Sequence, residues 1–257
     1  MNLLDNSDFR NPVNQRGQTS YTDDGYTIDR WCAWIDSGSG SVNVHDGYIS
    51  VTFQNHGSFF QRIEKGILNP SKMYTIAFKK TDGVIGITYP AYIGYGDIDD
   101  FVTLLDMRNG EVQNVEWAAL YEGEYTLDTI PEYQPKGYAT ELAECQRYAI
   151  PFLPSHQWGT LLYTAIAISD TTIQVYIPGS PLRPWVNPVI TFTASDVFIN
   201  ASKSGVTGFP SSISVAMTTP TGVIIDLYGF TGLSPGEIVF VKRGSASGQE
   251  GLLSGDL

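Results

Sequence analysis

The feature that most constrains this chain is a series of short alternating segments separated by residues that favour turns. Residues 41–45, 48–54 and 58–63 alternate apolar and polar side chains, and Asp46-Gly47 and the segment 55–57 separate them. Glycine adopts positive φ freely, and Asp and Asn tolerate it, so these separators predict tight turns between antiparallel strands. Strands that recur at this spacing are typical of a β-sandwich or jelly roll.

The same pattern runs through both halves of the chain. Further strands are predicted at residues 73–79, 84–88, 101–105, 112–121, 161–168, 173–177, 189–193, 197–200, 211–218, 222–228 and 238–242. The segment 178–188 contains four prolines, which cannot donate to a strand ladder, so it is expected to be an edge or an extended connection. The small, polar segment 243–257 is expected to be a tail that is mobile or held only by partners.

One stretch, residues 138–148, has the period of an amphipathic helix. A single short helix between two β-rich segments predicts a link between domains. We therefore expect an all-β chain with a jelly-roll sandwich at 1–136, a linking helix at 137–149, and an antiparallel C-terminal β-sandwich or oligomerisation domain at 150–257. The expected apolar stripe of the helix contains Tyr138, Leu142, Cys145 and Ala149, with Glu141, Glu144 and Arg147 pointing away.

The charge is negative and unevenly distributed. The chain carries a net −12, and residues 1–150 hold 21 acidic and 11 basic residues, against 6 and 4 in residues 151–257. The acidic first half would repel phosphate, so nucleic-acid binding is not expected. The nearly neutral second half would pack against copies of itself without strong repulsion.

The ends and the cysteines indicate neither secretion nor a membrane. The N-terminal residues have no basic region followed by an apolar run, so no signal peptide is expected. No apolar run approaches about 18 residues, so no membrane insertion is expected. Cys32 and Cys145 lie far apart and are predicted to be buried free thiols.

Motifs for catalysis are missing from the sequence. His45, His56 and His156 lack metal-ligand spacing, and the segment 244–248 has Ala246 where a nucleophilic serine would stand. We therefore expect no enzymatic activity and no cofactor. A glycoside hydrolase that trims polysaccharide is the alternative, because a pair drawn from Asp97, Asp99, Asp100, Glu116 and Glu64 would supply its two carboxylates.

Three of these acids form the best metal candidate. Asp97, Asp99 and Asp100 follow a glycine, and Ca²⁺ prefers several carboxylate and carbonyl oxygens. The competing interpretation is a solvated acidic loop.

Aromatic residues supply the candidate glycan site. Tyr89, Tyr92 and Tyr95 lie in a turn-rich stretch, and flat aromatic faces suit the C–H faces of sugar rings. Trp158 and Trp185 are further candidate platforms. The alternative is that these side chains cover the sandwich rim or meet a neighbouring subunit.

Four segments carry a family resemblance. Residues 2–17 (NLLDNSDFRNPVNQRG), 25–31 (GYTIDRW), 141–148 (ELAECQRY) and, more weakly, 181–192 resemble recurring blocks of phage and prophage tail-associated proteins, in the same order. Many members carry two aromatic residues after the Gln-Arg pair, whereas here Tyr148 is followed by Ala149. The resemblance implies a virion component whose N-terminal sandwich is similar to a carbohydrate-binding module.

The resemblance also implies a location and partners. It predicts a protein made in the bacterial host cytoplasm and incorporated in the phage particle as a tail fibre or receptor-binding appendage. It predicts a homotrimer that contacts other virion proteins and a bacterial surface glycan. The alternative is a purely structural head-fibre, capsid-decoration or baseplate component. Asn14, Arg16 and the Asp29–Trp31 run are expected to hold the fold, with a ligand role for Arg16 or Arg30 as the alternative.

Overall fold

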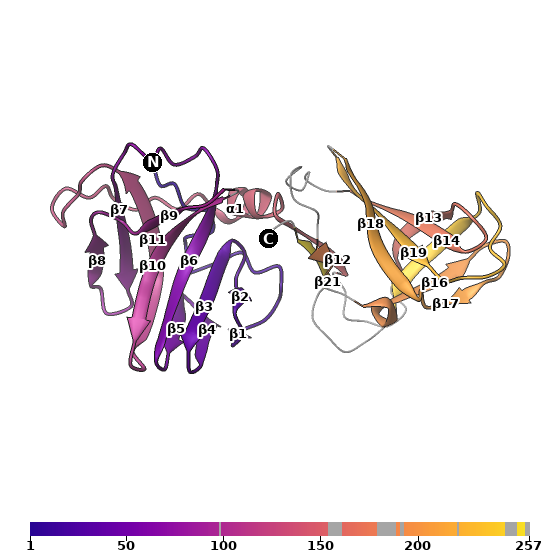
Figure 1. Ribbon diagram of the computed structural model, residues 1–257, viewed down its shortest axis with the longest axis horizontal. Helices are drawn as coiled ribbons and strands as arrows, with labels where there is room; N and C mark the ends of the chain where they lie inside the picture. The colour runs from indigo at the N-terminus through magenta and orange to yellow at the C-terminus, as the bar shows by residue number, and fades with distance from the viewer. Residues whose placement is uncertain are drawn as a thin grey trace. The chain divides into compact units, whose positions relative to one another are not determined.

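The computed structural model shows an all-β chain with antiparallel sheets and one short helix, which confirms the predicted fold class. It describes residues 1–97, 99–153, 161–178, 189–190, 193–219, 221–244 and 251–254. The chain divides into two compact units (Figure 1). Met1–Asn14 and Gln18–Cys145 form the first unit, and Gln15–Gly17 and Gln146–Leu257 form the second.

The first unit is a sandwich of two sheets (Figure 1). Its strands are β1 (Ser20–Tyr21), β2 (Gly25–Tyr26), β3 (Trp31–Ser37), β4 (Gly40–His45), β5 (Tyr48–Phe53), β6 (His56–Glu64), β7 (Tyr74–Lys80), β8 (Ile85–Thr88), β9 (Ile93–Tyr95), β10 (Asp99–Arg108) and β11 (Val112–Glu122). The six-stranded sheet has the order β1-β4-β5-β11-β7-β8, and the five-stranded sheet has the order β2-β3-β6-β10-β9. All strands predicted before residue 138 are present, with ends that differ by a few residues.

Alternation along the strands places the core between the two sheets. In β6 every second residue is buried, including Phe59, so the intervening side chains face outward. The rings of Phe59 and Trp31 stack with centroids 4.9 Å apart, and Phe9 meets Trp31 edge-on at 5.1 Å. All three side chains are fully buried, and each contributes roughly 1.5–3 kcal/mol by leaving water.

The chain covers the outer face of its own six-stranded sheet. The ring of Tyr133, beyond β11, stacks on Trp117 with centroids 4.6 Å apart and planes 3° apart. Tyr125 meets Tyr121 edge-on at 5.9 Å, and Ile130 packs against the same cluster. The segment after β11 therefore removes the aromatic side chains of this face from water.

The N-terminal segment has few ladder bonds and is held instead by side chains. Asn6 adopts a φ of +47°, and its Nδ2 donates to the carbonyls of Val13 and Asp29 at 2.8 and 2.7 Å. Trp31 Nε1 donates to the carbonyl of Asn6 at 2.8 Å. Arg30 is 1% exposed, and its guanidinium donates to the Arg62 carbonyl, so it holds the fold.

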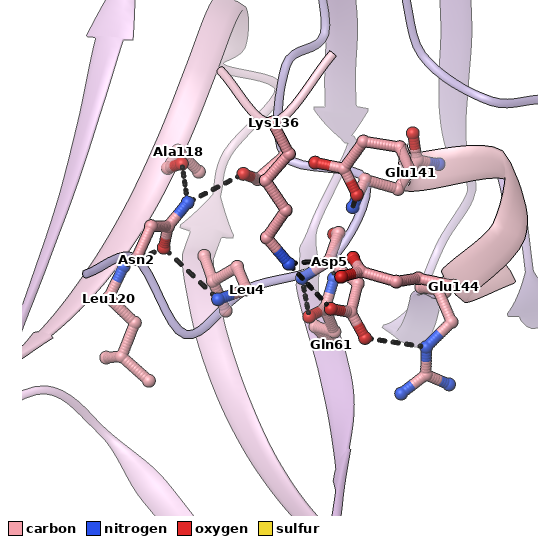
Figure 2. A network of polar contacts seen from close by, with 12 residues as sticks. Asn2, Leu4, Asp5, Gln61, Ala118, Leu120, Lys136, Glu141 and Glu144 are labelled. Atoms are coloured by element: carbon pink, nitrogen blue, oxygen red, sulfur yellow. Dashed lines mark hydrogen bonds and ion pairs between the residues drawn. The ribbon is translucent and has the colours of Figure 1, made fainter. Parts of the chain in front are cut away.

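Helix α1 (Tyr138–Cys145) is the last element of the first unit. The Glu141 carboxylate accepts the N–H of Asn6, and Lys136 Nζ lies 3.0 Å from Asp5 and 2.8 Å from Glu144 (Figure 2). The predicted apolar stripe is right for Cys145 and Ala149, which are fully buried, and wrong for Tyr138, which is 47% exposed. Glu141 was predicted to point away but is only 5% exposed, because the buried N–H of Asn6 needs its carboxylate as an acceptor.

The second unit is built on a seven-stranded sheet. Its elements are β12 (Ala149–Leu153), β13 (Leu161–Ala167), β14 (Thr172–Pro178), β15 (Val189–Ile190), the 3₁₀ turn η1 (Ala194–Asp196), β16 (Val197–Ala201), β17 (Thr207–Gly208), β18 (Ser212–Thr219), β19 (Gly222–Tyr228), β20 (Ile238–Arg243) and β21 (Gly251–Ser254). The order is β17-β16-β20-β13-β14-β19-β18, and β21 pairs with both β12 and β15 in a separate sheet. The predicted tail is therefore wrong at residues 251–254, because backbone pairing within the chain orders them as a strand.

A buried carboxylate fixes two turns of the second unit. Glu237 is 6% exposed and accepts the N–H groups of Lys203 at 3.0 Å, Ser204 at 2.8 Å and Ser234 at 2.9 Å. Burial alone would raise the pKa of Glu237, but these bonds and one from the Ser204 hydroxyl lower it to about 2. Glu237 thus acts as a fixed anionic acceptor for the turn after β16 and the turn before β20.

Candidate functional site

The three candidate tyrosines lie in and just before β9, an edge strand of the five-stranded sheet. Tyr95 ends β9 and pairs with Asp100 of β10, and the carbonyl of Tyr92 accepts the N–H of Thr103 at 3.1 Å. Tyr89, Tyr92 and Tyr95 are 38%, 67% and 44% exposed. The expected loop is therefore partly a strand. Trp158 and Trp185 lie outside the described residues.

The three candidate metal ligands do not converge. Asp100 is 1% exposed and forms an ion pair with Lys65 at 2.9 Å, whereas the preceding Asp99 faces the opposite side of β10. Lys65 Nζ also lies 5.8 Å from the centre of the Tyr95 ring. In the described part of the chain, no three His, Cys, Asp or Glu side chains form a group that would hold a metal ion. Asp97, Asp99 and Asp100 are therefore not gathered as Ca²⁺ ligands.

Aromatic side chains gather instead on the outer surface of the five-stranded sheet. We call this surface the aromatic face and define it by Trp34 of β3, Phe60 of β6 and Phe101 of β10. Their strand neighbours Ala33, Phe59 and Val102 are buried, so these three side chains point outward.

The strand register makes the aromatic face continuous. Trp34 lies opposite Ser58, two residues from Phe60 on β6, and Phe101 lies opposite Arg62, two residues beyond Phe60. The rings of Phe60 and Phe101 meet at 67° with centroids 6.1 Å apart. The three rings therefore cross three neighbouring strands as diagonal neighbours.

A glycine in the edge strand determines how Phe101 lies. A Cβ added at Gly94 would stand 1.8 Å from Phe101 Cζ, so the ring lies directly over this glycine. Gly94 pairs with Phe101 across β9 and β10. The absent side chain thus lets the ring lie against the sheet and present its other side to solvent.

A histidine between two carboxylates borders Trp34. His56 Nδ1 lies 3.0 Å from Asp36 and its Nε2 lies 2.8 Å from Asp106, while its ring meets Trp34 edge-on at 6.1 Å. Hydrogen bonds to Asp36 and then Asp106 raise the pKa of His56. The imidazolium form has a donor for each carboxylate, so the cluster fixes the ring beside Trp34.

The two outer faces of the sandwich differ in a way that bears on function. The six-stranded sheet has Trp117 and Tyr121 covered by the chain itself. On the aromatic face, with all described residues in place, Trp34 and Phe101 remain 48% and 37% exposed. Exposed flat rings flanked by carboxylates suit the stacking and hydroxyl hydrogen bonding of a sugar chain.

The sequence contained a signal for this site that motif searching missed. Phe59 and Phe60 are consecutive aromatic residues within an alternating strand, so only one of them can face the core. Trp34 was harder to find, because Trp31, Cys32 and Ala33 are all buried and obscure the alternation of β3.

Polar clusters elsewhere have a structural role. Burial raises the pKa of Glu141 to about 7, although its hydrogen bond from Asn6 opposes the shift. Burial also raises the pKa of the Cys145 thiol, which is fully buried. Both side chains belong to the buried face of α1, where Glu141 is 5% exposed and Cys145 is 0% exposed.

Among the residues that the structure describes, no helix has both the length and the hydropathy of a membrane span. Comparison with known protein families, curated proteins and solved structures finds no match for this chain.

Proposed function

We propose that the chain is a non-enzymatic bacteriophage appendage protein whose first unit binds bacterial surface glycans through the aromatic face. The observation that carries the proposal is the row of outward aromatic rings on one sheet, Trp34, Phe60 and Phe101, while the opposite sheet is covered. The resemblance of residues 2–17, 25–31 and 141–148 to phage tail-associated proteins supports the virion context.

The proposed binding mode follows from the spacing of the strands. Neighbouring strands lie about 4.8 Å apart, so an extended glycan crossing β3, β6 and β10 would meet one ring after another. Asp36 and Asp106 at one end, and Arg62 near the other, would bind sugar hydroxyls. A single shallow face of this kind binds weakly, and repeated copies on a particle would raise the effective affinity.

The test is glycan binding by the whole protein and by matched variants. An array of bacterial surface glycans identifies the ligand, and calorimetry then compares Trp34→Ala and Phe101→Ala with the control Tyr138→Ala. Tyr138 is 47% exposed, close to the 48% of Trp34, but lies on α1. We expect each face variant to bind at least about tenfold more weakly, since stacking on one ring contributes roughly 1–3 kcal/mol.

Two results would contradict this proposal. One is a wild-type protein that binds no glycan on an array that includes the host's surface polysaccharides. The other is glycan binding that Trp34→Ala and Phe101→Ala reduce no more than Tyr138→Ala. Immunogold labelling of intact particles tests the virion context separately, because labelled particles without glycan binding would favour a purely structural component.

A further inference from the structure

The second unit exposes large apolar side chains on one side of its seven-stranded sheet. We call this the apolar face, and it contains Ile166 (53% exposed), Tyr176 (43%), Met217 (56%), Ile238 (51%) and Phe240 (36%). Isolated exposed apolar residues are ordinary, but a connected set on one sheet is typical of an interaction surface.

Alternation and register show that these residues share one face. Ala165 and Ala167 flank Ile166 and are buried, as are Val239 and Val241 around Phe240. The inward side chains form the core of the unit, so the intervening ones point away from it.

The apolar residues are also direct neighbours across the strands. Ile166 of β13 lies opposite Ile238 of β20, and Ile224 of β19 lies opposite both Tyr176 of β14 and Met217 of β18. The set therefore extends across five adjacent strands of the sheet.

The charges of this face favour one kind of partner. Among the described strand residues of the sheet, Asp226 and Lys242 are the charged side chains on the apolar face, since Arg243 is buried on the other side. Asp226 already accepts hydrogen bonds from Gln174 Nε2 and the Tyr228 hydroxyl, both at 3.1 Å. The face therefore carries one acidic and one basic side chain and no net charge, so two copies of a chain with net charge −12 can meet here without strong repulsion.

The area of the apolar face is comparable with the area that a second copy of the chain would bury in a stable interface. The five strands that carry the face, at a spacing of about 4.8 Å and a length of about seven residues, give roughly 500 Å² in projection. The accessible area exceeds the projected area, and a stable interface takes about 800 Å² from each partner. A strongly charged partner, by contrast, would find almost no complementary charge.

We propose that the apolar face binds a second copy of this chain. The contact places Ile166 and Ile238 of one copy against the apolar face of the other. This proposal does not depend on glycan binding by the first unit, and either can fail alone.

The first experiment measures the molecular mass of the whole protein in solution. We expect an oligomer at about 10–100 µM by light scattering and sedimentation equilibrium. Ile166→Lys or Ile238→Lys should raise the dissociation constant of the oligomer at least about tenfold. The control is Ile67→Lys, because Ile67 is 50% exposed but belongs to the first unit. It should associate as the wild type does.

A second experiment avoids charged substitutions, which risk misfolding. Cys32 and Cys145 are 3% and 0% exposed, so Ile238→Cys provides the one readily reactive thiol among the described residues. A short bis-maleimide should link two Ile238→Cys chains covalently and should leave the control Ile67→Cys without a covalent cross-link. A monomeric wild type at about 100 µM, or equal cross-linking of the two cysteine variants, would overturn the proposal.

Discussion

Replacing Glu141 by glutamine is expected to remove most of the pH dependence of stability that the first unit shows near neutrality. Burial raises the pKa of this carboxyl from 4.5 to about 7. Because the folded pKa lies above the unfolded value, the stabilisation is fully present below pH 4.5 and is lost as the pH rises through about 7. The wild type should therefore be less stable at about pH 8 than at about pH 5.

The size of the effect follows from the shift. A rise from 4.5 to about 7 corresponds to roughly 3 kcal/mol at about 1.4 kcal/mol per unit. Partial access of solvent reduces this, so we expect a loss of about 2 kcal/mol between the two pH values. Glutamine still offers an oxygen to the Asn6 N–H but does not titrate, so Glu141→Gln should lack this loss.

The assay is urea unfolding followed by tryptophan fluorescence, with wild type and Glu141→Gln compared at both pH values. His56 also has a raised pKa and contributes pH dependence of the same sign, so the difference between the two proteins isolates Glu141. Equal pH dependence in the two proteins would refute the reasoning. A larger pH dependence in the variant would do so as well.

Three further outcomes are expected. Gly94→Ala should displace the Phe101 ring and weaken glycan binding about tenfold, as measured by calorimetry. The control Gly83→Ala changes a turn glycine with open space around it and should leave glycan binding unchanged. Lys136→Met should lower the free energy of unfolding by about 1–3 kcal/mol in urea titrations, because Asp5 and Glu144 lose their shared cation. Glu237→Gln should lower the melting temperature at neutral pH and reduce the loss of stability on acidification, as measured by calorimetry from neutral pH to about pH 2. The reason is that the lowered pKa of Glu237 gives stability that is lost as the pH falls through about 2.

Local pattern was sufficient for the long strands. The alternation of residues 58–63 and 112–121, and the glycine turns between strands, predicted β6 and β11 almost to their ends. Strand β3 was missed because its first three residues are all buried, and β21 because its partners β12 and β15 are distant in sequence. Pairing between remote segments leaves no periodic trace in either one.

The candidate site was less predictable for a related reason. The tyrosines at 89, 92 and 95 were selected for their spacing in the sequence, whereas the aromatic face joins residues from β3, β6 and β10 that only the register brings together. The buried position of Glu141 was also not predictable, because its acceptor role depends on an unpaired N–H 135 residues earlier.

The contact between α1 and Asn6 has a practical consequence for anyone who wishes to isolate the first unit. A recombinant fragment that ends at residue 136 would lack Glu141, the acceptor of the buried Asn6 N–H. Asn6 would then be held less firmly, and so would the Trp31 indole that donates to its carbonyl. A fragment extended to Cys145 retains Glu141 and both of these hydrogen bonds of Asn6. These nine added residues should therefore give a well-dispersed amide NMR spectrum, whereas the shorter fragment should be poorly folded.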